Sequence, residues 1–423
     1  MGKYFYDIHC HAINMSHPNF LAFIKRFEDP LFQDADKFLK KNRLKTLLGV
    51  NYALFNFLFF KKLNKENLMA LLSKAGLGDV TAYPRNLLAA MENDAASLFM
   101  LMEECILNHV MKNGKIIIDD KEYDKVILTP LIMDFGSKTA SYRDLHYNRT
   151  PVKKPVVEQT IDVLNGIKNY NEQSTNKLFE IYPFMGINPK NYELTEIEHM
   201  LDMYFSDYNG SHETLLSNMG VFDGDMHNVR SNTFAGIKVY PLMGFDPWPN
   251  DSKELEKVEL IYSRCMEKNI PITSHCSDEG FSIVSQEESE NFTTPAKWDK
   301  VLNKYNKLKL NLAHLGKQDN SVQWQKGVIE LILKYDNVYS DISYRAITDD
   351  FYKNLKSVLE NLKEPSHINK LKERLLFGSD FMINLLKIGS YCEFYNIFVS
   401  TSYFDSNEKN LFCSTNPEQF LFS

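Results

Sequence analysis

Eight short apolar segments, each bounded by turn residues, recur along this 423-residue chain. From the second segment onward they are spaced roughly 30 to 55 residues apart, which is enough for a crossover helix plus loops. Several intervening stretches, such as 252–269 and 297–307, have a helical repeat of apolar residues. Repeated strand–helix units predict an α/β fold with a parallel sheet, and eight of them predict a distorted (β/α)8 barrel of the TIM type. The predicted strands cover residues 4–11, 125–134, 178–187, 234–241, 270–277, 308–316, 337–343 and 374–381.

The interval between the first two predicted strands is much longer than the others. It covers residues 12–124 and is too rich in apolar residues to be a disordered linker. We expect a single barrel domain over 1–423, with 12–124 as a large, mostly helical insertion after strand 1. The insertion would lie on the face that carries the βα loops, where it would cap or wall the active site. The predicted helical segments are 18–27, 43–63, 66–77 and 94–114.

Strongly polar residues occupy the carboxyl ends of the predicted strands, where barrels of this kind build their active sites. His9 and His11 alternate with Cys10, so both imidazoles lie on one side of the first strand. The later strands end in Lys238, His275, His314 and Asp380. Four of the chain's 11 histidines therefore gather at one end of the predicted barrel. Imidazole and carboxylate together suit Zn²⁺, Mn²⁺ or Fe²⁺, so the pattern predicts a divalent metal site.

The order of these residues, HxH on strand 1, Lys on strand 4, His on strands 5 and 6 and Asp on strand 8, resembles the amidohydrolase superfamily of metal-dependent hydrolases. The resemblance is sharpest to its amidohydrolase-2 branch, which also contains metal-dependent decarboxylases. It covers the first strand and the chain from about residue 125 onward, and leaves out the insertion. The motifs that carry it are "GIKVYPLMGFDPW", "PITSHCS", "PAKWDKVLNKYNKLKLNLAHLG", "NVYSDIS", "RLLFGSDF" and "STNPEQFLF".

The resemblance implies a ligand set for one metal ion, most simply Zn²⁺, made of His9, His11, His275 and Asp380. In single-metal members the strand-6 histidine, here His314, contacts the substrate or the bound water. In two-metal members the strand-4 lysine, here Lys238, is carboxylated and bridges both ions, and His314 becomes a ligand of the second. A carbamate reverses the sign of an ammonium group that a nearby dication would repel. A site with one metal ion and a site with two are both consistent with these residues. Lys238 could instead remain a cation and bind a carboxylate of the substrate.

Hydrolysis is the reaction that this resemblance implies. Metal-activated water would attack the carbonyl of an amide, cyclic amide, lactone or ester, with Asp380 and His314 as the catalytic residues and Asp380 taking the proton from the water. One alternative is a decarboxylase of an aromatic or unsaturated carboxylic acid, against which Lys238 counts. A second alternative is a non-catalytic barrel that acts as a binding protein, against which the intact ligand set counts.

Further residues could reach the site from neighbouring loops. Tyr240, two residues after Lys238, and His146, in "YRDLHYNRT", are candidate substrate contacts. Asp341 and Asp134 end the seventh and second predicted strands, and loop capping or hydrogen bonding behind the site is the favoured role of both. Asp7 is expected to lie below the histidines and orient them.

The composition argues against nucleic acid and membrane as partners, and leaves a small-molecule substrate as the expected partner. The chain has 48 basic and 55 acidic residues, with a net charge of −7 and no long basic run, which argues against nucleic acid. The most apolar long stretch, 46–62, is shorter than a membrane span and contains Asn51 and Asn56. No room precedes the first strand for a signal peptide. The six cysteines lack CxxC spacing, which favours reduced thiols. We therefore expect a cytoplasmic protein, with a homo-oligomer as one option.

Overall fold

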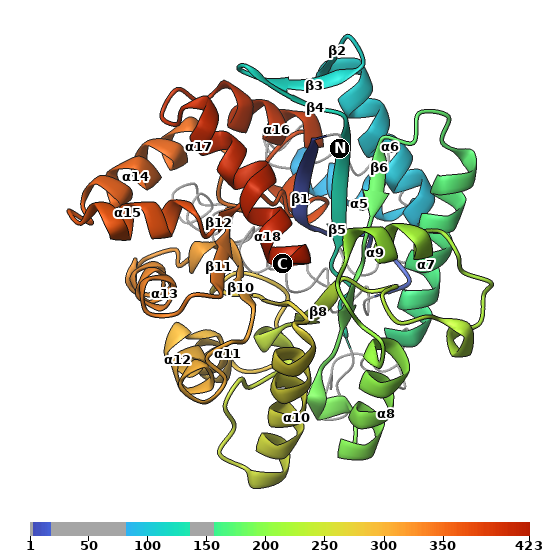
Figure 1. Cartoon of the computed structure of the whole chain (residues 1–423), viewed down its shortest axis with the longest axis vertical. Coiled ribbons are helices and arrows are strands. Elements are labelled where there is room, and N and C mark those ends of the chain that lie inside the picture. Colours follow the sequence, from blue (N-terminus) through green and yellow to red (C-terminus); the bar gives the residue numbers. More distant parts are fainter. Residues whose placement is uncertain (1–2, 18–81, 136–155) are drawn as a thin grey trace, which may run out of the picture.

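The computed structural model describes residues 3–17, 82–135 and 156–423. Its centre is a barrel in which all neighbouring strands run parallel (Figure 1). In order around the barrel the strands are β1 (Tyr4–Cys10), β5 (Lys125–Pro130), β6 (Phe179–Ile181) continued by β7 (Phe184–Gly186), β8 (Gly236–Val239), β9 (Ile272–Ser274), β10 (Leu310–Leu312), β11 (Val338–Asp341) and β12 (Leu375–Leu376).

Two parallel bridges close these strands into a ring. Leu131 pairs with Phe184, which joins β5 to β7, and Cys10 pairs with Phe381, which joins β1 to the segment after β12. The third strand position is divided into β6 and β7 at Pro183, which has no backbone N–H to donate to a strand ladder. The predicted (β/α)8 barrel is confirmed, with its eight strands at the predicted places.

Most strands are shorter than predicted because their carboxyl ends turn into loops or single helical turns. The predicted strand 308–316, for example, contains only Leu310–Leu312 before a 3₁₀ turn begins at Ala313. The backbone of His314 in this turn has a φ of 62°, which no extended strand can contain. The polar site residues thus lie at or just beyond the strand ends.

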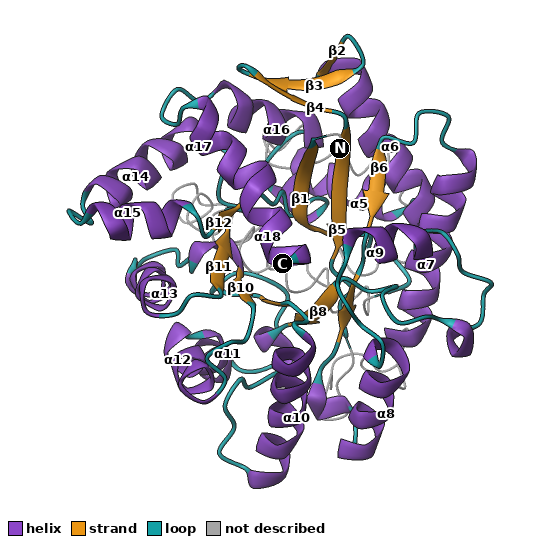
Figure 2. Ribbon diagram, viewed as in Figure 1, coloured by secondary structure: helices purple, strands orange, loops and turns teal. Residues whose placement is uncertain are grey.

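Helices surround the barrel on the outside (Figure 2). The helices after β5 are α7 (Val156–Gln173), α8 (Leu194–Phe205), α9 (His212–Asn218), α10 (Ser252–Lys268), α11 (Gln286–Thr293), α12 (Pro295–Lys304), α13 (Gln323–Lys334), α14 (Asp349–Glu360), α15 (Pro365–Lys372), α16 (Tyr391–Ser400), α17 (Ser406–Asn410) and α18 (Asn416–Phe422). The helices predicted at 252–269 and 297–307 correspond to α10 and α12.

Helix α10 shows why these segments are helical. The side chain of Asp251 caps its first turn by accepting hydrogen bonds from two backbone N–H groups. Val258, Ile261, Tyr262 and Cys265 are buried at i, i+3, i+4 and i+7, so one stripe packs on the barrel. The helix ends where Asn269 takes a left-handed conformation, with a φ of 57°.

The described part of the predicted insertion consists of residues 12–17 and 82–124. It contains α5 (Ala82–Met91), α6 (Ala95–His109) and a small antiparallel sheet, β2 (Met111–Lys112), β3 (Lys115–Ile118) and β4 (Lys121–Tyr123). The prediction of helix through residue 114 was wrong, because Asn113 and Gly114 form a turn with positive φ at both positions. The predicted helices at 18–27, 43–63 and 66–77 lie outside the described residues.

Helix α6 is packed into the barrel wall, against α7 on one side and α16 on the other. The buried carboxylate of Glu103 accepts hydrogen bonds from Tyr170 Oη at 2.6 Å and from the backbone of Leu178 at 2.8 Å, which ties α6 to the segment that enters β6. A disulfide joins Cys105 of α6 to Cys392 of α16. The expectation of six reduced thiols is therefore wrong for this pair, whose Cα atoms the helix packing brings to 6.0 Å.

The other four cysteines are free and buried. Within the described ranges, no helix has the length and apolar character needed to cross a membrane.

Candidate metal centre

The structure brings six of the predicted site residues to the carboxyl end of the barrel. Each is at most 6 % exposed. They are His9, His11, Lys238, His275, His314 and Asp380. Burial of so many ionisable groups in one place is costly unless they are paired or hold a ligand.

His9, His11 and Asp380 form one compact group, with ligand atoms within 4.8 Å of one another. The Oδ1 atom of Asp380 lies 3.4 Å from His9 Nε2 and 3.2 Å from His11 Nε2. The backbone N–H of Asp380 donates to the carbonyl of His9 at 2.7 Å, and the φ of Asp380, 59°, lies in the left-handed region. This hydrogen bond joins β1 to the segment after β12, and it fixes the carboxylate of Asp380 opposite the two imidazoles.

The hydrogen bonds of the two imidazoles show which ring nitrogens face Asp380 without a proton. His9 Nδ1 donates to Asp341 Oδ2 at 3.0 Å, and His11 Nδ1 donates to the carbonyl oxygen of Leu131 at 2.9 Å. In a neutral imidazole the other nitrogen then carries a lone pair. Among the described residues, His9 Nε2 has no hydrogen-bond partner although it is buried.

Two lone pairs and a carboxylate oxygen thus converge on one point. They repel one another unless a proton or a cation lies between them. Two imidazoles and a carboxylate form a donor set that suits Zn²⁺ and related divalent ions. The residues therefore fit a divalent metal.

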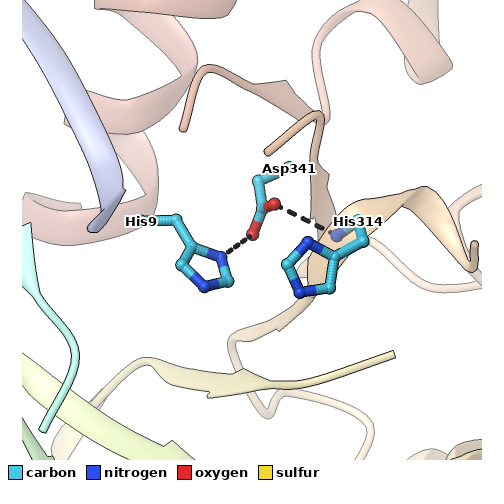
Figure 3. A group of neighbouring side chains, drawn as sticks. All are labelled: His9, His314 and Asp341. Atoms are coloured by element: carbon cyan, nitrogen blue, oxygen red, sulfur yellow. Dashed lines mark hydrogen bonds and ion pairs between the residues drawn. The ribbon is translucent and has the colours of Figure 1, made fainter. Parts of the chain in front are cut away.

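Asp341 forms a second group with His9 and His314 (Figure 3). Its Oδ2 accepts from His9, while its Oδ1 accepts from the backbone N–H of His314 at 3.1 Å. Oδ1 also accepts from the backbone N–H of Ser343 at 3.1 Å and from the Ser343 hydroxyl. One carboxylate on β11 thus contacts residues from β1 and from the turn after β10.

His275 belongs to neither three-residue group but lies beside His314. Its Nε2 donates to the carbonyl of Glu279 at 2.9 Å, which leaves a lone pair on Nδ1, 3.1 Å from His314 Nε2. The ring of Tyr240, a predicted substrate contact, packs against His275 with 4.5 Å between centroids. His146, the other predicted substrate contact, lies outside the described residues.

Lys238 is an unpaired buried cation at the end of β8. Its Nζ has no hydrogen-bond partner within the described part of the chain. Burial lowers the pKa of its ammonium group to about 8, and the attraction of Asp341 and Asp380 only partly offsets that cost. Near neutral pH a measurable fraction of Lys238 is therefore an uncharged, nucleophilic amine.

Burial keeps His9, His275 and His314 neutral. It lowers the pKa of His9, lowers the pKa of His275 well below its usual range and lowers the pKa of His314 to about 4. Burial opposes ionisation of Asp380, but the neighbouring imidazoles of His11 and His9 outweigh that cost and lower the pKa of this carboxyl. Neutral imidazoles and ionised carboxylates are the protonation states that metal ligands need.

Replacing His314 with Gln should flatten the acid side of the stability curve of the metal-free protein. The folded pKa of about 4 lies below the ordinary value of 6.5, so the unfolded chain binds more protons between these values. As the pH falls through this window, wild type should lose roughly 3 kcal/mol of unfolding free energy through this group. Urea unfolding at a series of pH values measures the difference. His227→Gln, at an exposed turn, is the control. If the unfolding free energy of both variants changed equally with pH, the lowered pKa of His314 would be contradicted.

The carboxylates of two further acids, Asp7 and Asp134, join neighbouring segments of the chain. Asp7 accepts from the backbone N–H of Ser379 at 2.8 Å and from Tyr391 Oη at 3.1 Å, which ties β1 to the segment that carries Asp380. Asp134 accepts from the backbone of Asn188 at 3.0 Å and from Tyr192 Oη at 2.9 Å, which joins two loops.

Ser343 was not among the predicted site residues, and Asp341 was expected only to cap a loop or to hydrogen-bond behind the site. Alternation along the strand places both residues on the same side as the site, and that spacing was the signal available. Nothing in the sequence, however, relates this pair to His9, which precedes Asp341 by 332 residues.

Comparisons with known proteins found one family model and several solved structures that are similar to this chain. Residues 219–422 match the family model described as amidohydrolase. No curated protein matches the chain. Similar solved structures include 4-oxalomesaconate hydratase from Rhodopseudomonas palustris, at 10 % identity and a TM-score of 0.45 over 99 % of this chain and 95 % of that one. A probable 2-pyrone-4,6-dicarboxylic acid hydrolase from Acinetobacter baumannii with citric acid bound has 12 % identity and a TM-score of 0.41, over 78 % and 88 %.

An amidohydrolase from Burkholderia multivorans with bound zinc is a further match, at 11 % identity and a TM-score of 0.42 over 81 % of this chain and 94 % of that one. The matched family segment contains four of the six clustered residues, Lys238, His275, His314 and Asp380. The closing bonds of the barrel bring the other two, His9 and His11, against Asp380. Residues 219–422 of this chain are therefore similar to the amidohydrolase family.

Proposed function

We propose that this protein is a metal-dependent hydrolase that cleaves an amide, cyclic amide, lactone or ester. The observation that carries the proposal is the convergence of His9 Nε2, His11 Nε2 and Asp380 Oδ1, with His9 Nε2 buried and unpartnered among the described residues. A protein without a ligand for these atoms would leave a buried acceptor unsatisfied, which costs roughly 1–3 kcal/mol.

His9, His11 and Asp380 would hold the metal, most simply Zn²⁺, and His275, the fourth predicted ligand, lies outside this group of three. When bound, such an ion polarises a substrate carbonyl and lowers the pKa of water at the site to about 7. Asp380 is ionised and buried, so it can accept the proton of the attacking water and pass it to the leaving group. His275 and His314 would stand beside the reacting carbonyl, with their facing nitrogens 3.1 Å apart.

The neutral state of His314 suits either of two tasks. Its Nε2 can serve as a ligand of a second ion, or it can hydrogen-bond the substrate or the attacking water. Tyr240 packs on His275 and is a candidate substrate contact on the same side. A Cβ atom at residue 280 would clash with the Tyr240 hydroxyl, so Gly280, with a φ of +132°, leaves room for it.

Metal analysis combined with a substrate panel tests this proposal. The full chain is purified without chelator, with bicarbonate present, and its metal content is measured by plasma mass spectrometry. It is then assayed against amides, cyclic amides, lactones and esters, and separately against aromatic and unsaturated carboxylic acids for release of carbon dioxide. Metal-dependent hydrolysis supports the proposal. Decarboxylation alone, or failure to bind zinc or manganese after reconstitution, would overturn it.

Lys238→Ala should change the metal stoichiometry. An uncharged, unpartnered amine can react with carbon dioxide to give a carbamate and a proton, and the carbamate would supply an anionic oxygen donor for a second ion. We expect about two equivalents of metal in wild type and about one in Lys238→Ala. Lys309→Ala is the matched control, because Lys309 is also buried with its pKa lowered to about 8 but lies just before β10, at the opposite end of the barrel. One equivalent in wild type and in both variants would instead make the centre mononuclear.

A further inference from the structure

We propose that Asp341 is a positioning residue that fixes the tautomer of His9 and the conformation of His314. This inference rests on the proposed function, because it assigns the group that prepares His9 to bind a metal. Asp341 itself is fully buried and would not touch the substrate. It would act through the two histidines that it contacts, His9 on β1 and His314 in the turn after β10 (Figure 3).

The side chain of Asp341 is the acceptor in each of its hydrogen bonds. Oδ2 accepts from His9 Nδ1 at 3.0 Å and from Asn311 Nδ2 at 2.7 Å. Oδ1 accepts from the backbone N–H groups of His314 and Ser343, each at 3.1 Å, and from the hydroxyl of Ser343. An ionised carboxylate has about four lone-pair positions and no donor, so these five donors use its full accepting capacity.

The contact with His9 determines where that ring carries its proton. Because Asp341 Oδ2 can only accept, His9 Nδ1 must donate, and the lone pair is left on Nε2, which faces Asp380. The contact with His314 acts on the backbone. It holds the N–H of a residue with a left-handed φ of 62°, in the turn that directs the imidazole to His275.

The substitution Asp341→Asn should therefore invert the tautomer of His9. The side-chain NH₂ of asparagine cannot occupy the Oδ1 position, since it would face two fixed backbone N–H groups. It would take the Oδ2 position, where the amide of Asn311 can rotate to accept, because Asn311 Oδ1 has no partner among the described residues. The NH₂ would then donate to His9 Nδ1, which forces the ring proton onto Nε2 and blocks the metal-binding lone pair.

Nuclear magnetic resonance of ¹⁵N-labelled histidine tests this directly. Two-bond ¹H–¹⁵N correlation spectra distinguish a protonated ring nitrogen from one with a lone pair. The full chain is stripped of metal and measured at pH 8, where His9 is neutral because its pKa is lowered. The His9→Gln variant identifies the His9 signals. We expect a protonated Nδ1 in wild type and a protonated Nε2 in Asp341→Asn.

Zinc affinity, measured by competition with a chromophoric chelator, is the second readout. Loss of such a hydrogen-bond partner typically lowers metal affinity 10–100-fold, and we expect a loss in that range for Asp341→Asn. Asp336→Asn is the matched control, because its side chain is 89 % exposed. Ser343→Ala should keep the wild-type tautomer, since Asp341 still accepts from His9.

The outcomes separate this inference from the proposed function. A wild-type His9 with its proton on Nε2 would overturn the inference even if Asp341→Asn fails to fold. So would an unchanged His9 tautomer in a folded Asp341→Asn variant. If the tautomers behave as expected but no hydrolysis is found, the positioning role stands and the proposed reaction is wrong.

Discussion

The double variant His9→Ala, His11→Ala should be purified with almost no bound metal. Both imidazoles present a lone pair on Nε2 to the same oxygen of Asp380, at 3.4 and 3.2 Å. Without them, the carboxylate alone cannot match the affinity of a three-residue nitrogen and oxygen set. Metal content by plasma mass spectrometry, normalised to the amino acid content of the sample, measures the effect.

The matched control removes two exposed imidazoles, in the variant His199→Ala, His227→Ala. It should retain the metal content of wild type, which excludes adventitious binding by surface histidines. Circular dichroism checks that the double site variant remains folded. Undiminished, tight metal binding in a folded His9→Ala, His11→Ala protein would refute the proposed centre.

Asp380→Asn should lower kcat by about 10³-fold, even with metal supplied in excess. The change removes a negative charge from the ligand group and also removes the base that accepts the proton of the attacking water. General base catalysis alone contributes typically 10²–10⁴-fold. The variant keeps the shape of the side chain, so the loss should appear in kcat more than in KM.

Steady-state kinetics on whichever substrate the panel identifies measures this loss. Asp350→Asn, at an exposed position of α14, is the control and should have wild-type kcat. A kcat within a few-fold of wild type for Asp380→Asn would assign the base role to another group, and His314 would be the first to examine.

The sequence predicts the barrel well because its signals are local. Each strand is a short apolar segment followed by a helical repeat, and the alternation of His9, Cys10 and His11 places both imidazoles on one side. The six clustered residues could be found because charged or imidazole side chains at the ends of apolar strands have few structural explanations.

The remaining features depend on contacts that sequence patterns do not encode. The left-handed backbone of His314 follows from its turn, and the bond between Asp341 and His9 joins strands that only the closed barrel makes neighbours. The hairpin at Asn113 and Gly114 is different. Its N-G pair was a readable signal that the surrounding apolar, helix-like pattern outweighed.

The seam between β1 and the segment after β12 has a consequence for synthesis on the ribosome. The hydrogen bonds that close it include Ile8 to Phe377 at 3.2 Å and Asp380 to His9 at 2.7 Å, so one partner is translated hundreds of residues after the other. Until then the open edge of β1 is a template for pairing with other chains. Pairing strands that lie so far apart in the sequence also slows folding, because the chain loses conformational entropy before the stabilising contacts form. The nascent chain should therefore depend on chaperones until its last barrel strand emerges, and ribosome-bound chains stalled before residue 377 should cross-link to them.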